Sequence, residues 1–199
     1  GFRAADLTEL AEHITVGGIT EIAYQKEPDS IVWAVRADGT LLGMTYRREQ
    51  DVIGWHQHVI GGKSDAGGAQ AKVESIAVIP ASDGSRDELW MIVKRHVFGQ
   101  TKRYVEYMEA PLADAADQSN AFYVDSGLTG TFDPPSEVVD GLEHLEGESV
   151  QILADGATHP DQIVVGGMAT LDRPVSTVQA GLPYDHLSEL RTLNIEAAA

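Results

Sequence analysis

The chain has 199 residues, of which 43% are hydrophobic and 23% charged, a composition typical of a globular protein with one large or two small domains. Fourteen basic and 31 acidic residues give a net charge of -17, which repels phosphates and argues against tight nucleic-acid binding. Without cysteine the chain has no disulfide or thiolate chemistry, and it shows neither a membrane-spanning apolar run nor a signal peptide. From its two ends, Gly1 and residues 197–199, we expect an internal piece of a longer protein.

The first predicted element is a short helix near the N-terminus. Leu7, Leu10, Ala11 and Ile14 recur at helical spacing, and Asp6 is a suitable N-cap residue. The sequence therefore predicts one helix over residues 6–14.

An internal repeat follows this helix. Residues 19–24 resemble residues 73–78, and residues 29–36 resemble residues 87–94 in the same order, with a proline-containing turn between the paired segments. Each copy continues into further strand-like runs across a glycine-bearing turn. The loop over residues 61–69, rich in small residues, separates the copies. Residues 1–112 are therefore predicted to hold two repeats, at about 19–60 and 73–109.

Each repeat has the size of a propeller blade, a sheet of four short antiparallel strands that needs neighbours on both faces. Two blades cannot close a ring. Either the other blades lie outside this chain or in a partner, or the two sheets pack on each other as a sandwich.

Residues 113–199 are predicted to form a second, smaller β-domain. Residues 112–120 are either helical or a linker, and the segment 185–195 is either a helix or a departing strand. Short strand candidates separated by glycine and proline turns favour a small barrel or sandwich. They lie at 121–124, 150–153, 162–165, 168–171 and 175–182.

Several side chains in the first region have the chemistry of a binding site. His56 and His58 share one face of a predicted strand, but a zinc site needs three or four ligands and no third can be named, so no cofactor or metal is expected. Tyr46 and Trp55 are the best candidates for an exposed aromatic surface that binds sugar. The remaining strand aromatics are interpreted as core anchors, namely Trp33, Trp90, Phe98 and Tyr104.

Two stretches of the first region carry a family resemblance. Residues 29–46 (DSIVWAVRADGTLLGMTY) and residues 48–56 (REQDVIGWH) resemble a signature of large phage and prophage tail proteins. Further matching portions lie at 122–128, 141–148 and 181–184. The resemblance is to the tail nozzle, or tail tubular protein B-like, proteins. It implies a propeller with an inserted barrel, whose shape is likened to the first catalytic-cysteine half-domain of ubiquitin-activating enzymes.

The function implied by this resemblance is structural rather than enzymatic. We expect a component of the virion tail, made in the bacterial cytoplasm, that contacts sister subunits of a homo-oligomer and other tail proteins around a DNA channel. The acidic charge fits this role, because a channel wall that binds phosphates would slow sliding DNA. The main alternative is a carbohydrate-binding or host-recognition module that uses Tyr46 and Trp55. A hydrolase is a weaker third hypothesis, since no motif indicates a substrate.

Overall fold

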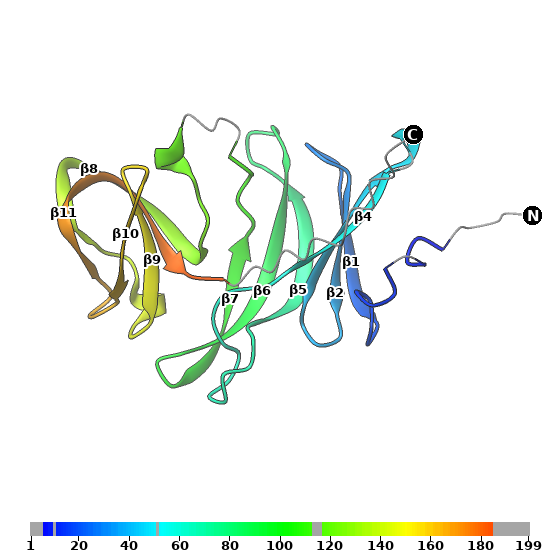
Figure 1. Cartoon of the computed structure of the whole chain (residues 1–199), viewed down its shortest axis with the longest axis horizontal. Coiled ribbons are helices and arrows are strands. Elements are labelled where there is room, and N and C mark those ends of the chain that lie inside the picture. The colour runs from blue at the N-terminus through cyan, green and yellow to red at the C-terminus, as the bar shows by residue number, and fades with distance from the viewer. Residues whose placement is uncertain (1–5, 10, 51, 113–116, 185–199) are drawn as a thin grey trace, which may run out of the picture.

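The computed structural model describes residues 6–9, 11–50, 52–112 and 117–184. It confirms an all-β protein: three antiparallel sheets follow one another along the chain and lie side by side in a row (Figure 1). The helical segments in the described residues are single 3-10 turns, and none is long and apolar enough to cross a membrane.

Sheet 1 is the predicted first repeat and has four strands in sequence order. These strands are β1 (Ile19–Gln25), β2 (Ile31–Arg36), β3 (Leu41–Arg47) and β4 (Val52–His58). Gly39 adopts a positive φ of 91° in the Asp-Gly turn between β2 and β3, where an L side chain would be strained. A 3-10 turn, η1 (Arg48–Gln50), joins β3 to β4.

Sheet 2 is the second repeat, but it has three strands rather than the four predicted. They are β5 (Lys72–Pro80), β6 (Asp87–Val97) and β7 (Gln100–Tyr107). The chain leaves the sheet after β7, where the Met108 amide still donates to the Leu89 carbonyl. Pro111 follows and has no N–H for a further ladder. A fourth strand is therefore missing from the described part of this repeat.

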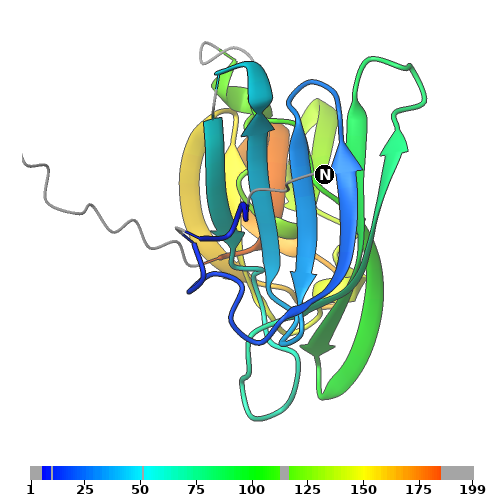
Figure 2. The ribbon, with the colours of Figure 1, turned by 90° about the vertical axis from the view of Figure 1, so that its right-hand side faces the viewer.

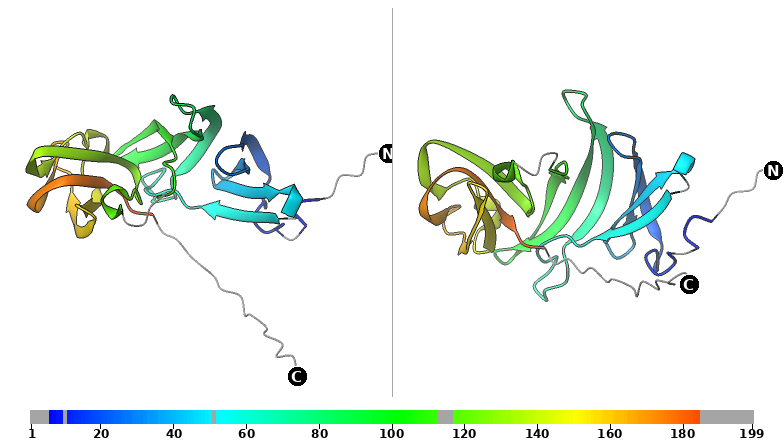
Figure 3. Two further views of the ribbon diagram at one scale, coloured as in Figure 1. Left: turned by 90° about the horizontal axis from the view of Figure 1, so that it is seen from above. Right: turned by 45° about the horizontal axis from the view of Figure 1, so that its top comes forward.

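Sheets 1 and 2 pack against each other along the β1–β2 side of one and the β5–β6 side of the other. Figure 3 shows the two sheets splaying apart away from this contact. Their shared core is apolar and fully formed, and sheet 1 contributes Trp33, Val35 and Leu41 to it. The main residues from sheet 2 and the preceding loop are Ile60, Ala71, Val73, Ile76, Leu89, Met91 and Val93.

The hairpins of the two repeats share an irregularity that fixes their structural alignment. In β1 the register slips between Ile19 and Glu21, and in β5 it slips between Val73 and Ser75. Both slips are β-bulges at the same place in the repeat. When the bulges are superimposed, Ala23 and Ala77 coincide, and their cross-strand partners are the two tryptophans, Trp33 and Trp90.

This structural alignment differs by one residue from the sequence comparison of 29–36 with 87–94, which aligns Trp33 with Met91. Side chains alternate between faces along a strand, so a shift by one residue exchanges the faces. We call "front" the face that carries Trp33 in sheet 1 and Trp90 in sheet 2, and "back" the opposite face. The core then joins the front of sheet 1 to the back of sheet 2.

The predicted N-terminal helix is wrong, since residues 6–9 and 11–17 form turns and bends. Asp6 accepts hydrogen bonds from the backbone and hydroxyl of Thr8, and the Ala11 amide donates to the Thr8 carbonyl at 2.7 Å. The Leu7 carbonyl, which Ala11 would use in an α-helix, instead accepts from the Trp55 indole. The segment lies on the back of sheet 1, nearest the viewer in Figure 2.

Sheet 3 contains the remaining strands in the order β10-β9-β11-β8. The bounds are β8 (Asp125–Val139), β9 (Ser149–Ala154), β10 (Ala157–Ile163) and β11 (Ala169–Leu182). Its core is formed by apolar side chains of all but β10 and by the segment around η3 (Glu143–Leu145).

The predicted small barrel is not closed in the described residues, because β8 and β10 remain the two edges of sheet 3. Both edge strands contain proline, Pro160 in β10 and Pro134 and Pro135 in β8. Proline cannot donate to a ladder and therefore belongs at an edge.

Two strand predictions in this region are also corrected. The predicted strand at 121–124 lies outside the sheets, after the 3-10 turn η2 (Gln118–Asn120). The predicted break at 172–174 is absent, because β11 passes through Pro174 with a register shift. Residues 113–116 and 185–199 lie outside the described residues, so the boundary at 112/113 and the last element stay predictions.

The loop before β5 joins sheet 2 to sheet 3. Arg95 of β6 is fully buried, forms an ion pair with Glu106 at 2.8 Å and donates to the Gly61 carbonyl. The Gly61 amide in turn donates to Asp125 at the start of β8, at 2.6 Å. Burial raises the pKa of Asp125, while the bond from Gly61 opposes that shift. The predicted inter-blade loop is therefore a structural joint.

Candidate interaction surface

The four residues predicted as ligand contacts lie on two opposite faces of sheet 1. Met44 pairs with Trp55, and Gly43 pairs with His56, so adjacent residues of β4 point in opposite directions. Tyr46 and Trp55 therefore lie on the back, and His56 and His58 lie on the front. The structure does not bring them together into one site.

The back-face pair is only partly accessible. Tyr46 and Trp55 are both half-buried, and the Trp55 indole donates to the Leu7 carbonyl at 2.9 Å. Arg36, also on the back, donates to the Ile14 carbonyl at 3.0 Å. The N-terminal segment thus contacts the surface on which a sugar would have to stack.

On the front, His56 and His58 contact each other and Trp33. His56 Nδ1 lies 2.8 Å from His58 Nε2, and the His58 ring centroid is 5.2 Å from that of Trp33. Gly43 makes room for this arrangement, because a Cβ built there would lie 2.1 Å from His56 Cε1. The absence of a side chain at Gly43 therefore lets the His56 ring pack directly against β3.

Burial keeps both histidines neutral at physiological pH. It lowers the pKa of His56, and burial together with the neighbouring His56 lowers the pKa of His58 to about 4. One ring can then donate a hydrogen bond to the other. The described residues contain no group of three or more histidine, aspartate or glutamate side chains placed to hold a metal ion.

The front of sheet 2 is an apolar sheet face whose side chains are largely exposed among the described residues. It alternates with the buried residues of β6, so Trp90 and Ile92 point away from the core that contains Met91. Their partners on β7 are Tyr107 and Val105. The exposed fractions of its main aliphatic and aromatic members are Ile79 47%, Ile92 38%, Val105 71% and Tyr107 46%.

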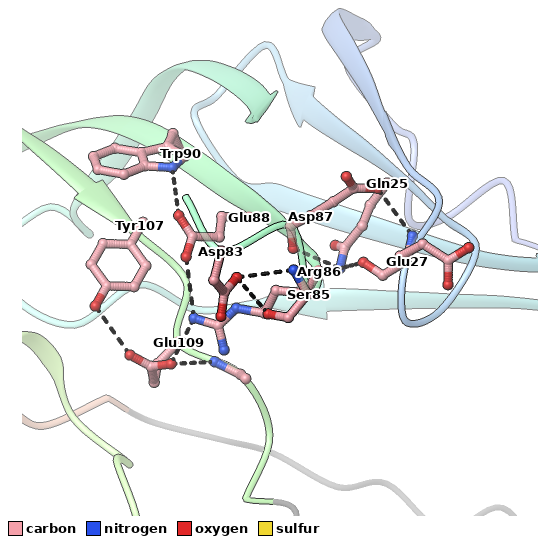
Figure 4. A network of polar contacts seen from close by, with 11 residues as sticks. Gln25, Glu27, Asp83, Ser85, Arg86, Asp87, Glu88, Trp90, Tyr107 and Glu109 are labelled. Atoms are coloured by element: carbon pink, nitrogen blue, oxygen red, sulfur yellow. Dashed lines mark hydrogen bonds and ion pairs between the residues drawn. The ribbon is translucent and has the colours of Figure 1, made fainter. Parts of the chain in front are cut away.

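Two aromatic rings at one end of this face are held by a polar network (Figure 4). The Trp90 and Tyr107 ring centroids lie 5.3 Å apart. The Trp90 indole donates to Glu88 at 3.1 Å, and the Tyr107 hydroxyl donates to Glu109 at 3.1 Å. Arg86 donates to both carboxylates, at 3.3 and 3.0 Å. The rings are thus fixed before any partner arrives.

The electrostatics favour the charged form of this network. Burial works against ionisation of Glu109, but hydrogen bonds from the Ala110 amide and Arg86 outweigh it and hold its pKa below the ordinary value. Burial, followed by the negative charge of Glu109, raises the pKa of the Tyr107 hydroxyl. Tyr107 therefore remains a donor, and both carboxylates are paired with Arg86.

The same network fixes sheet 1 against the end of sheet 2. Asp87, next to Arg86 and Glu88, accepts hydrogen bonds from the Lys26 and Glu27 amides at 2.9 and 3.0 Å. Gln25 donates to the carbonyl oxygens of Glu27 and Asp87. The aromatic pair therefore lies beside the joint between the two repeats.

The prediction that all four strand aromatics are core anchors holds for Trp33, which is 3% exposed. It is wrong for Phe98, and Trp90 and Tyr104 are only half-buried. Phe98 is 73% exposed, in the turn after β6. A signal for the open face was present: Trp90 and Ile92 interrupt the alternation of apolar and polar residues in β6. A strand that is apolar on both faces needs cover on both.

Comparison with known proteins adds no assignment at this point. No protein-family model and no curated protein matches this sequence. The interpretation of the surface therefore rests on its own geometry. The surface combines the exposed Tyr107 with the half-buried Trp90 and Arg86 beside aliphatic side chains. Tryptophan, tyrosine and arginine are the residues that dominate binding energy in protein interfaces.

Proposed function

We propose that this chain is a non-enzymatic structural module that works by stacking its sheets face to face with neighbouring subunits. The observation that carries the proposal is the front of sheet 2. This face has the same backbone register as the front of sheet 1. The front of sheet 1 is covered within the chain, whereas the front of sheet 2 remains exposed. A sheet with one apolar face covered and the equivalent face open is the expected state of a blade that lacks its next neighbour.

We infer that sheets 1 and 2 are successive blades of a propeller-like stack. Front-to-back packing is what a propeller uses, because every blade repeats the orientation of the one before it. A sandwich, the alternative from sequence, would bring equivalent faces of the two repeats together, and the bulge alignment argues against that.

We place this module in a phage or prophage tail, at the nozzle or tube around a DNA channel. The support is the likeness of residues 29–46 and 48–56 to tail nozzle proteins, together with the net charge of -17. A strongly acidic surface does not neutralise phosphates and so lets DNA slide. Its partners would be sister subunits and other tail proteins.

Carbohydrate recognition through Tyr46 and Trp55 has weaker support. The Trp55 indole N–H is already bonded to the Leu7 carbonyl, and both rings are half-buried on the back of sheet 1. Glycan-array binding that disappears in Trp55→Ala would nevertheless favour this alternative over the structural one.

The tail assignment is tested on particles rather than on the isolated chain. We expect antibodies raised against residues 1–112 to label the tails of purified particles in immunogold electron microscopy, with pre-immune serum as the control. The gene should also lie beside portal, terminase and tail genes. Unlabelled tails together with a metabolic operon would contradict the proposal.

A further inference from the structure

We propose that a second copy of this chain covers the open front of sheet 2 with the back of its own sheet 1, so that copies associate head to tail. This inference rests on the proposed structural function and names the partner of the surface described above. The contact would repeat between molecules the contact that already joins the two sheets within one molecule.

The internal contact shows which side chains such an interface needs. Trp33 and Val35, on the front of sheet 1, are 3% and 2% exposed where they meet the back of sheet 2. From the other side, Ile76 is 6% exposed and Val78 packs against the same cluster. An aromatic and a β-branched side chain of sheet 1 therefore meet β-branched side chains of sheet 2.

Each of these residues has a structural equivalent on an open face. With the bulges superimposed, Trp90 and Ile92 correspond to Trp33 and Val35. On the back of sheet 1, Ile22 and Tyr24 correspond to Ile76 and Val78. All four equivalents keep apolar or aromatic side chains, so the chain carries both halves of a second interface of the same kind.

Exposure confirms that both halves are available. Ile22 is 67% and Tyr24 55% exposed on the back of sheet 1, and Ile92 is 38% exposed on the front of sheet 2. Exposed large apolar side chains gathered on one face are uncommon on a protein that acts alone.

The N-terminal segment covers only part of the back of sheet 1. The N-terminal segment binds Trp55 of β4, at the far side of sheet 1 from β1. The internal contact uses β1 and β2 against β5 and β6. On the back of sheet 1 the segment reaches β2 at Arg36, but Ile22 and Tyr24 of β1 remain exposed. A second copy can therefore pack on β1, at the edge of sheet 1, without displacing the segment.

The front of sheet 2 and the back of sheet 1 are different surfaces, and this determines the symmetry of the assembly. A two-fold dimer would need one face to meet itself. Here the front of sheet 2 is complemented by a different face, so the contact is heterologous and leaves one front and one back free in every assembly that does not close into a ring. Copies should therefore form chains or rings whose length grows with concentration.

Sedimentation velocity on the full 199-residue chain tests this, with Ile22→Asp and Ile92→Asp as the two face variants and Ile163→Asp as the control. Ile163 is 56% exposed on β10 of sheet 3, away from both faces. We expect the wild type and the control to show larger species as concentration rises. Each face variant alone should remain monomeric.

Mixing the two face variants is the decisive step. Ile22→Asp retains an intact front and Ile92→Asp retains an intact back, so an equimolar mixture should form one interface and stop at a heterodimer. Circular dichroism and thermal melting confirm that the variants fold. If either aspartate variant unfolds, Tyr24→Asp and Val105→Asp replace the pair on the same two faces.

Three results would overturn the inference. The wild type could stay monomeric up to about 1 mM, a concentration at which any specific interface is populated. Ile92→Asp could block association while Ile22→Asp does not, which indicates a front-to-front pair or another occupant such as a further blade. The mixture could also fail to form heterodimers. If immunogold labels the tails but the chain sediments as a monomer, the proposed structural function stands and only the head-to-tail contact is rejected.

Discussion

Sheet 1 and sheet 2 are built from the same hairpin and the same bulge, yet the front is buried in sheet 1 and exposed in sheet 2. Trp33 on the front of sheet 1 is 3% exposed, while its equivalent Trp90 lies on a face whose neighbours Ile92 and Val105 are 38% and 71% exposed. The difference is in what lies opposite, since sheet 2 covers the front of sheet 1. Equivalent residues therefore have different energetic roles, and four predictions test this.

The largest effect is expected from removing the buried tryptophan. Trp33→Ala leaves a large cavity and removes the hydrogen bond from the indole to Gln25, so it should lower the free energy of unfolding by about 3–5 kcal/mol. The matched variant Trp90→Ala should cost about 1 kcal/mol in the monomer, because its face is open. Urea denaturation measures both, and equal losses would show that the two fronts are equally covered.

The histidine pair gives sheet 1 a pH dependence of its own. The folded-state pKa of His58 is about 4, below its unfolded value of about 6.5, so the unfolded chain binds the proton more tightly. Stability should fall as the pH drops from about 6.5 to 4, by up to about 3 kcal/mol. Denaturation of His58→Gln across this range should give a flatter profile. His13→Gln, at an exposed position, should retain the wild-type slope.

Two glycines on neighbouring strands test how closely the histidines pack. Gly43→Ala puts a Cβ against the His56 ring and should lower the free energy of unfolding by about 1–3 kcal/mol. Gly54→Ala is the control, because nothing lies within 4 Å of a Cβ at that position. Thermal melting of both, with His56→Ala added to Gly43→Ala, measures the clash. An unchanged melting temperature for Gly43→Ala alone would refute the close contact.

The smallest effect is expected at the polar network on the front of sheet 2. Arg86→Met removes the bridge between Glu88 and Glu109, and we expect a loss of about 1 kcal/mol because these side chains are partly exposed. Lys102→Met on β7, at an exposed position, is the control. The two variants differ further in self-association, which Arg86→Met alone should weaken. Identical sedimentation of both would mean that the network does not position the aromatic pair.

The sequence predicted part of the candidate surface and missed its most important feature. The likeness of residues 87–94 to residues 29–36 indicated a strand, but it could not tell whether Trp90 or Met91 pointed inward. Neither could it place Tyr46 and His56 on opposite faces of sheet 1, because that depends on the pairing of β3 with β4. Hydrogen-bond networks such as the one around Arg86 join residues 23 positions apart and leave no local pattern.

What the sequence alone determined was the all-β class, the repeated hairpin, the turns at Gly39 and elsewhere, and the segments from which most strands are built. These depend on local preferences and on side-chain alternation, which each segment carries by itself. Only the tertiary structure decided the register of the two repeats, the open edges of sheet 3 and the loss of the N-terminal helix. In a strand with a period of two residues, one bulge exchanges the faces, and only the packing of one sheet on another reveals which face is covered.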